Sequence, residues 1–126
     1  MSVENKKAVA YIRDLEGRSS LLVVSDAKVQ REAIMECAEN KGLEITNIYL
    51  DLPSDQNQTQ FLRMKEDLKL ESNQVKYVLY FDFEIISETE EGMLDFDREM
   101  KELGIQEWCC TMARSMRIIM ENKYEY

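Results

Sequence analysis

Histidine is absent from this chain of 126 residues. Histidine is the commonest general base in enzymes and the commonest side chain among metal ligands. Its absence excludes a Ser–His–Asp triad and a Cys–His nucleophile pair. Any chemistry that the chain performs must therefore use hydroxyl, thiol, carboxylate, amide or cationic groups.

Proline and glycine are also scarce, with one and four residues respectively. No stretch has the composition of a flexible linker, and no internal repeat is visible. Hydrophobic residues make up 44% of the chain and charged residues 33%, which is typical of a globular protein. The sequence therefore predicts a single domain over residues 1–126, without a separate DNA-binding domain.

Long hydrophobic runs are missing, since none approaches the roughly 20 residues of a membrane span. The first seven residues, MSVENKK, do not resemble a signal peptide. The three cysteines, Cys37, Cys109 and Cys110, are odd in number and widely spaced, which argues against a disulfide framework. We expect a cytoplasmic protein with free thiols.

Basic residues are outnumbered, and the net charge is -9. Residues 84–107 contain nine acidic and only two basic side chains. A protein that binds duplex DNA gains affinity by neutralising phosphates with Lys and Arg, and no basic patch is evident in the sequence. The acidic segment is interpreted as a solvated helix face, with a docking face for a basic partner as the alternative.

Hydrophobic patterning predicts strands that alternate with helices. The predicted strands are 7–13, 43–50, 75–83 and 105–111, and the predicted helices are 26–41, 59–70, 88–103 and a short one over 113–120. Ser25 or Asp26 is a suitable N-cap for the first helix, which Gly42 ends, and Gly104 ends the third. This order predicts an α/β fold with a mostly parallel sheet of four or five strands and helices on both faces.

The last part of the chain combines adjacent cysteines, Trp108 and several methionines. Cys109 and Cys110 are neighbours in a predicted strand, so their side chains should point to opposite faces of the sheet, as core residues rather than as a redox pair. Trp108 is expected at a surface or an interface. Methionine fills adaptable interfaces as well as cores, so the C-terminal region is a candidate for partner binding.

Several motifs occur in an order that suggests a family. The first strand ends in Tyr11-Ile12-Arg13, the first helix contains Gln30-Arg31-Glu32-Ala33, the second strand ends at Asp51, and the third is followed by Asp82. This ordered set resembles the catalytic domain of serine recombinases (resolvases and invertases), over roughly residues 7–105. The resemblance implies a resolvase-like three-layer fold, with Tyr11, Arg13, Gln30, Asp51 and Asp82 as the remnant of the family's site.

The same resemblance indicates that catalytic positions are lost. The family's serine attacks a DNA phosphodiester, and several arginines stabilise the charge of the transition state. Its position, two residues after Arg13, holds Leu15. The family's arginine positions hold Gln58, Phe83 and Ile86. No catalytic residue, metal or cofactor is therefore expected.

Three alternatives to this interpretation involve neighbouring residues. Ser19 and Ser20 are displaced hydroxyls, but a nucleophile shifted by several residues would lose in-line geometry, so they are interpreted as polar loop residues. Arg13 is expected to form an ion pair with Asp51 or Asp82 rather than to bind an anion. A cluster of Asp14, Asp51 and Asp82 could also bind Mg²⁺, as acidic clusters do in receiver domains. This alternative is weaker, because a receiver domain would normally carry a lysine at the end of a late strand, and Thr111-Met112 offers none.

We therefore expect a catalytically inactive, resolvase-like protein that acts as a protein–protein interaction or regulatory module. Its partner would be a recombinase, a transcription or phage factor, or a second copy of the chain; direct DNA binding and membrane binding are not expected. The alternatives are a residual DNA recombinase or nuclease and an acidic DNA mimic that occupies a basic groove.

Overall fold

The computed structural model describes residues 5–15, 26–70 and 74–110. Its strands are β1 (Lys7–Arg13), β2 (Glu44–Asp51), β3 (Tyr77–Tyr80) and β4 (Gln106–Cys109). Its helices are α1 (Ala27–Lys41), α2 (Thr59–Leu70), α3 (Phe83–Ile86) and α4 (Glu90–Glu102). Ser19, Ser20 and the helix predicted over 113–120 lie outside the described residues.

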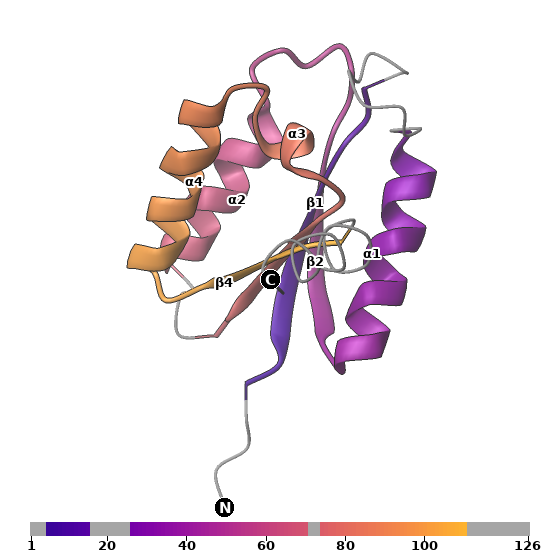
Figure 1. The fold of residues 1–126 in the computed structure, drawn as a ribbon, viewed down its shortest axis with the longest axis vertical. Coiled ribbons are helices and arrows are strands. Elements are labelled where there is room, and N and C mark those ends of the chain that lie inside the picture. The colour runs from indigo at the N-terminus through magenta and orange to yellow at the C-terminus, as the bar shows by residue number, and fades with distance from the viewer. Residues whose placement is uncertain (1–4, 16–25, 71–73, 111–126) are drawn as a thin grey trace, which may run out of the picture.

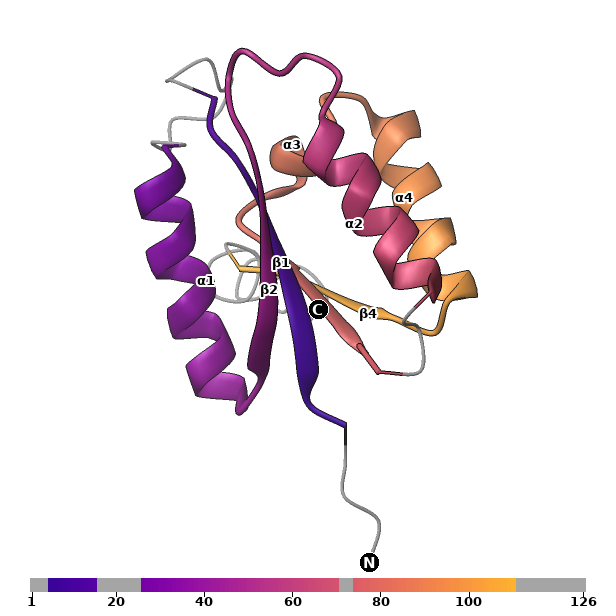
Figure 2. The ribbon, with the colours of Figure 1, turned by 180° about the vertical axis from the view of Figure 1, so that it is seen from behind.

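The four strands form one parallel sheet in the order β2-β1-β3-β4. Figures 1 and 2 show three layers, with α1 on one face of the sheet and α2, α3 and α4 on the other. The predicted α/β fold with helices on both faces is thus confirmed. The strand that follows α1, β2, lies on one side of β1, and the strand that follows α2, β3, lies on the other side. The strand order therefore reverses between β1 and β3.

Alternation along β1 explains why each face has its own core. Ala8, Ala10 and Ile12 belong to a cluster that α1 covers, whereas Val9 and Tyr11 belong to the larger cluster under α2, α3 and α4. Successive side chains of a strand point to opposite faces, so a central strand without polar interruptions supplies both cores. All five side chains are buried.

The helix ends agree closely with the signals in the sequence. Asp26 is the N-cap of α1, with its carboxylate accepting a hydrogen bond from the Val29 N–H at 2.8 Å. Gly42 ends α1 with φ 67°, a left-handed conformation that favours glycine. Gly104 follows α4 with φ 72°. The boundaries of α2 are those predicted from the sequence.

The third strand is shorter than predicted, and a helix that was not predicted follows it. β3 ends at Tyr80, and residues 83–86 form α3, where Ile85 and Ile86 are buried. Periodicity alone does not distinguish a short buried strand from a buried helical turn, because both contain consecutive apolar residues. The change from strand to helix occurs at Asp82, which is the N-cap of α3. β4 is also shorter than the predicted 105–111.

None of the described helices is long and apolar enough to cross a membrane. Cys109 packs in the larger core and Cys110 against the α1 side, which confirms their predicted opposite orientations. All three cysteines are free. Trp108 is partly buried against the α1 side, and Lys41 Nζ lies 3.7 Å from the centre of its ring.

Candidate functional site

The candidate site lies at the carboxyl ends of the strands, where the strand order reverses between β1 and β3. Ligands of open parallel sheets bind at such a switch point. Arg13 ends β1 opposite Asp51, the last residue of β2, and the Asp14 N–H donates a hydrogen bond to the Asp51 carbonyl at 3.0 Å. Asp82 follows the end of β3. The fold therefore brings together the strand ends that carry the remnant residues.

Tyr11 and Asp51 form the buried centre of this region. The Tyr11 hydroxyl donates a hydrogen bond to Asp51 Oδ2 at 2.6 Å and accepts one from Gln58 Nε2 at 3.2 Å. Tyr11 and Asp51 are 0% and 1% exposed. Burial, and then the bond to Asp51, raises the pKa of Tyr11 far above its usual range, so its hydroxyl remains protonated.

Asp51 also caps a helix from a distance. Its Oδ1 accepts a hydrogen bond from the Gln60 N–H at 2.8 Å, and its Oδ2 accepts one from the Phe61 N–H at 3.0 Å. These N–H groups belong to the first turn of α2, where no intrahelical acceptor is available. Negative charge at a helix N-terminus is also favourable. Asp51 therefore fixes α2 to the sheet, and both of its oxygens are engaged.

Gln58 precedes α2 in a conformation that few side chains adopt. Its φ is 50°, in the left-handed region. The neighbouring Asp55 accepts hydrogen bonds from the Asn57 and Thr59 N–H groups, so the loop is held on both sides of Gln58. The bond from Gln58 Nε2 to Tyr11 connects this loop to the buried network.

Gln30 connects α1 to the end of β1. Its Nε2 donates a hydrogen bond to the Arg13 carbonyl at 2.7 Å, and its Oε1 accepts one from the Arg13 N–H at 3.2 Å. Gln30 is 0% exposed, so these bonds satisfy groups that water cannot reach. The side chain thereby continues the hydrogen bonding of β1 beyond the sheet.

The prediction that Arg13 forms an ion pair with Asp51 or Asp82 is wrong. Among the described residues, Arg13 pairs with neither carboxylate. The oxygens of Asp51 already accept bonds from Tyr11 and the first turn of α2. Asp82 accepts a hydrogen bond from the Glu84 N–H at 3.4 Å as the cap of α3. Both carboxylates act as helix caps instead.

The alternative of a magnesium cluster at Asp14, Asp51 and Asp82 is also wrong. Within residues 5–15, 26–70 and 74–110, no group of three His, Cys, Asp or Glu side chains is placed to hold a metal ion. A hard cation needs several oxygen ligands directed at one point. The engagement of Asp51 in the Tyr11 and α2 contacts explains why this carboxylate is not directed at a shared centre.

The positions interpreted as lost have apolar surroundings or structural contacts. Leu15 and Ile86 are buried in the larger core, with 3% and 2% exposure. Phe83 is partly exposed, and its ring centre lies 6.3 Å from that of Tyr80. Gln58 is the polar member of this set and bonds to Tyr11. This region therefore presents a hydrogen-bonded scaffold in which Leu15 and Ile86 contribute to the core.

Two further pairs of polar groups lie near β4, and no motif in the sequence indicates that their members meet. The Tyr80 hydroxyl donates a hydrogen bond to Glu107 Oε1 at 3.0 Å. Burial, and then a hydrogen bond with Asp97 of α4, raises the pKa of Glu107 to about 7. The sequence signal for an inward-facing Glu107 is the alternation of β4, because Glu107 lies on the same face as the core residue Cys109.

The other pair consists of two thiols. Cys37 of α1 belongs to the smaller core, and Cys110, which follows β4, packs against that core. The side chain of each affects the pKa of the other. The pattern of α1 places Cys37 on its inner face, and alternation places Cys110 opposite Cys109. Periodicity does not reveal that the two thiols meet, since that depends on the position of β4 relative to α1.

No protein-family model matches this chain, and no curated protein matches it. Solved structures match its fold. A resolvase family site-specific recombinase from Streptococcus pneumoniae is 21% identical, with TM-score 0.69, over 93% of this chain and 89% of that one. The N-terminal catalytic domain of TP901-1 integrase is 15% identical, with TM-score 0.67, over 96% of this chain and 100% of that one.

A third match is the C-terminal catalytic domain of ISC1926 TnpA, an IS607-like serine recombinase. It is 16% identical, with TM-score 0.68, over 93% of this chain and 78% of that one. At these identities the comparisons establish the fold alone. The chain thus has a resolvase-like fold, as the motifs of the sequence imply.

Proposed function

We propose that this resolvase-like chain is catalytically inactive and acts as a protein–protein interaction module. One observation carries the proposal: the polar residues of the remnant site bond to one another and to backbone, and hydrophobic side chains occupy positions where the family has its reactive groups. Tyr11, Asp51 and Gln58 form one network, and Gln30 binds the Arg13 backbone.

Strand cleavage by a serine requires a hydroxyl in line with a phosphodiester and cations around the phosphorus. Leu15 provides no hydroxyl and is buried in the core. Phe83 and Ile86 provide no charge at the two positions where the resemblance expects arginines. Arg13 alone is a weak substitute, because the transition state spreads charge over several phosphoryl oxygens.

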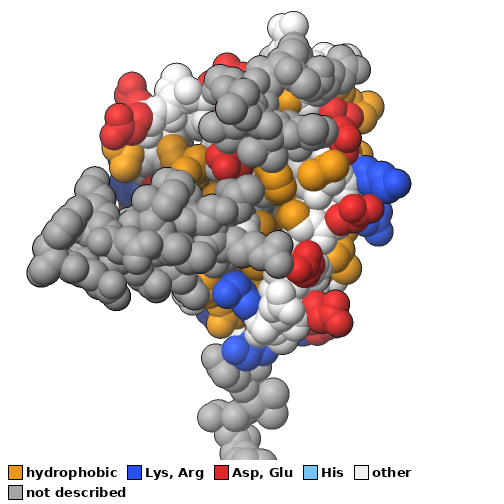
Figure 3. Space-filling view, turned by 45° about the vertical axis from the view of Figure 1, so that its right-hand side comes forward, with side chains coloured by type: hydrophobic (Ala, Val, Ile, Leu, Met, Phe, Trp, Pro, Cys, Tyr) orange, Lys and Arg blue, Asp and Glu red, His pale blue; other side chains and the backbone are white. Residues whose placement is uncertain are grey.

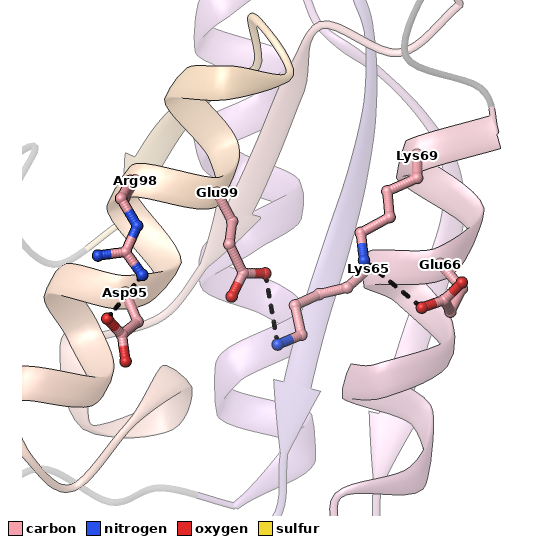
Figure 4. Close-up of polar contacts among 6 residues, drawn as sticks. All are labelled: Lys65, Glu66, Lys69, Asp95, Arg98 and Glu99. Carbon is pink, nitrogen blue, oxygen red and sulfur yellow. Dashed lines mark hydrogen bonds and ion pairs between the residues drawn. The ribbon is translucent and has the colours of Figure 1, made fainter.

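The charge distribution also disfavours a duplex substrate. In the layer of α2 and α4, Lys65 pairs with Glu99 at 3.4 Å, Lys69 with Glu66 at 3.6 Å and Arg98 with Asp95 at 3.0 Å (Figure 4). On the face shown in Figure 3, the visible basic side chains form separate small groups among acidic and hydrophobic ones. Counterion release from phosphates requires a concentration of unpaired cations.

A cleavage assay tests the loss of activity. Supercoiled plasmid is incubated with the chain and Mg²⁺, and nicked, linear and covalently protein-bound DNA are separated on denaturing gels. We expect the same DNA products from wild type, from Arg13→Ala and from a blank without protein. Nicking that Arg13→Ala abolishes, or a covalent protein–DNA adduct, would overturn the proposal and establish a residual recombinase or nuclease.

Exposed hydrophobic side chains support the interaction role. Leu52, Leu62 and Leu94 are 55%, 52% and 59% exposed. Leu52 follows β2, and Leu62 and Leu94 belong to the first halves of α2 and α4, so all three come from segments near the carboxyl ends of the strands. Hydrophobic side chains among charges are typical of contact surfaces, although single ones occur on any protein.

The partner that this surface fits is a basic protein. The net charge of -9 opposes association between two copies of the chain and attracts a surface of opposite sign. Glu88, Glu90, Glu91 and Glu102 are exposed on α4 or next to it. A partner with Lys and Arg around hydrophobic side chains would complement these residues.

Charge reversal tests the proposed interaction. The immobilised chain is presented to extract from its own source cells, and bound proteins are identified at low and high salt. We expect a basic protein whose binding weakens with salt and is lost in the Glu88→Lys/Glu102→Lys variant. The Glu32→Lys/Glu39→Lys variant makes the same charge change on exposed positions of α1 and should bind as wild type does.

Three outcomes would contradict the proposed partner. Equal loss of binding in both double variants would indicate general electrostatic attraction. Sedimentation of the isolated chain as a dimer would assign the surface to self-association. Displacement of the bound protein by duplex DNA would instead favour an acidic DNA mimic.

A further inference from the structure

Cys37 and Cys110 meet on the α1 side of the sheet, away from the remnant site. Cys37 is 8% exposed and belongs to the smaller core, and Cys110 packs against that core from the end of β4. Lys41, one turn after Cys37 on α1, lies over the ring of Trp108, two residues before Cys110, which places the two cysteines beside each other. Neighbouring cysteines can form a disulfide when their Cα atoms lie within about 7 Å of each other.

The surroundings make the two thiols chemically different. The interaction with the Cys110 side chain and, to a smaller extent, the charge of Lys41 lower the pKa of Cys37 against the opposing effect of burial, and the resulting pKa is about 7. The same interaction, together with burial, raises the pKa of Cys110. Cys37 is therefore the nucleophile of the pair, since the thiolate is the reactive form of cysteine.

Lys41 is fixed in the position where it acts on Cys37. It lies one turn after Cys37 on α1, and its Nζ is 3.7 Å from the centre of the Trp108 ring. Stacking on the indole restrains the lysine chain near the thiols. Glu36, the neighbouring acid, raises the pKa of Cys37, but its effect is smaller than that of Lys41.

The third cysteine, Cys109, cannot form a disulfide with Cys37 unless the end of β4 changes its conformation. Cys109 points into the larger core, where its Sγ lies 3.7 Å from the Phe81 carbonyl as a hydrogen-bond donor. It is as deeply buried as Cys37, at 8% exposure. Cys109 is therefore an internal control that adjoins Cys110 in sequence and points to the opposite face of the sheet.

We propose that Cys37 and Cys110 are a peroxide-sensitive modification site that forms a reversible intramolecular disulfide. The Cys37 thiolate attacks one oxygen of hydrogen peroxide, which breaks the O–O bond, releases hydroxide and leaves Cys37 as a sulfenic acid. Cys110 then attacks the Cys37 sulfur, and water leaves. In total, two thiols are oxidised and one peroxide is reduced to two molecules of water. A dithiol reductant restores both thiols.

The disulfide would join α1 directly to the end of β4. In the reduced protein these elements are held by side-chain packing of the smaller core. A cross-link between residues far apart in sequence restricts the unfolded chain, so the melting temperature of the oxidised protein should rise by several degrees. The proposal does not depend on the proposed function, because it concerns the opposite face of the sheet.

Peptide mapping of the full wild-type chain is the direct test. The reduced protein is treated with hydrogen peroxide, blocked with N-ethylmaleimide and digested with trypsin without reduction. We expect alkylation to fall from three thiols to one and peptide 32–41 to become linked to peptide 102–114. The product should be monomeric, should return to three reactive thiols with dithiothreitol, and should form faster above pH 7 than below it, as the pKa of about 7 requires.

The single serine variants assign the bond. Cys109→Ser should form the same cross-link and retain no reactive thiol, whereas Cys37→Ser and Cys110→Ser should form none. Circular dichroism verifies that each variant is folded, and Cys37→Ala and Cys110→Ala replace any serine variant that is not. A link that contains Cys109, a disulfide between chains, or oxidation of Cys37 that proceeds to the sulfinic acid without a cross-link would each overturn the proposal.

Discussion

The carboxyl ends of β1 and β2 differ from the β4 side of the molecule in what their polar groups do. At the first region, Asp51 and Gln30 use their polar atoms to bond Tyr11, α2 and the Arg13 backbone. At the second, Glu107 and Cys37 have pKa values of about 7. The polar groups of the first region hold neighbouring elements together, whereas the groups with pKa values near neutral pH lie beside β4.

This difference shows that buried polar groups of one protein can contribute in different ways. A buried carboxylate that accepts three hydrogen bonds stabilises the fold, and its removal leaves donors unsatisfied. A half-buried carboxyl that shares a proton with its neighbours responds to pH. The comparison predicts large effects on stability at the first region and smaller, condition-dependent effects at the second.

The largest effect is expected for Asp51→Ala. The substitution leaves the Tyr11 hydroxyl and the Gln60 and Phe61 N–H groups without their acceptor in a buried place. We expect a loss of ~3–5 kcal/mol in the free energy of unfolding, measured by urea denaturation. Asp55→Ala is the control, because this carboxylate also accepts backbone hydrogen bonds but is only partly buried, and it should cost much less. Equal losses would remove the contrast between buried and partly buried caps.

The next effect is expected for Leu15→Ser, which places a hydroxyl at the position of the family's nucleophile. Leu15 is buried in the larger core, so the serine loses packing and buries a polar group. We expect a loss of ~2–4 kcal/mol and no cleavage of supercoiled DNA. Leu15→Ala separates the cost of the cavity from that of the hydroxyl. Cleavage by the serine variant would show that the scaffold still assembles an active site.

A smaller, pH-dependent effect is expected for Glu107→Gln. The pKa of Glu107 is raised in the folded state, so the protonated acid stabilises the fold below its unfolded pKa, and this contribution is lost as the pH rises through about 7. The glutamine variant should match wild type near about pH 5 and exceed it near about pH 8 by on the order of 1 kcal/mol, after allowance for solvent screening.

Urea denaturation at the two pH values measures this difference. Glu102→Gln removes an exposed acid near the end of α4 and should show no such change with pH. A wild-type chain that gains stability relative to Glu107→Gln as the pH rises would contradict the raised pKa.

The smallest effect is expected for Lys41→Met, which retains the aliphatic chain and removes the charge. The loss of the contact with the Trp108 ring should cost ~0.5–1 kcal/mol. Because the charge of Lys41 lowers the pKa of Cys37, the thiol should also react more slowly with iodoacetamide at neutral pH in the Cys110→Ala background. Lys69→Met removes a charge from α2, away from the thiols, and should leave the rate unchanged.

The local sequence determined the elements of this protein. Period-3.6 patterning identified α2, and the Asp26 cap and Gly42 end identified α1, because these signals involve residues within one or two turns. Alternation assigned Cys109 and Cys110 to opposite faces. The apolar run from residue 75 was only partly resolved, since periodicity does not separate the end of a short buried strand from the start of a helical turn such as α3.

The tertiary structure alone decided which polar groups meet. Tyr11 contacts Asp51 because β2 lies beside β1 in a register that includes an irregularity between Ala8 and Val9, and no local pattern encodes that shift. Cys37 contacts Cys110 because α1 covers the face to which the residue after β4 points. Helix and strand preferences act over a few neighbouring residues, whereas hydrogen-bond partners far apart in the chain depend on how whole elements pack.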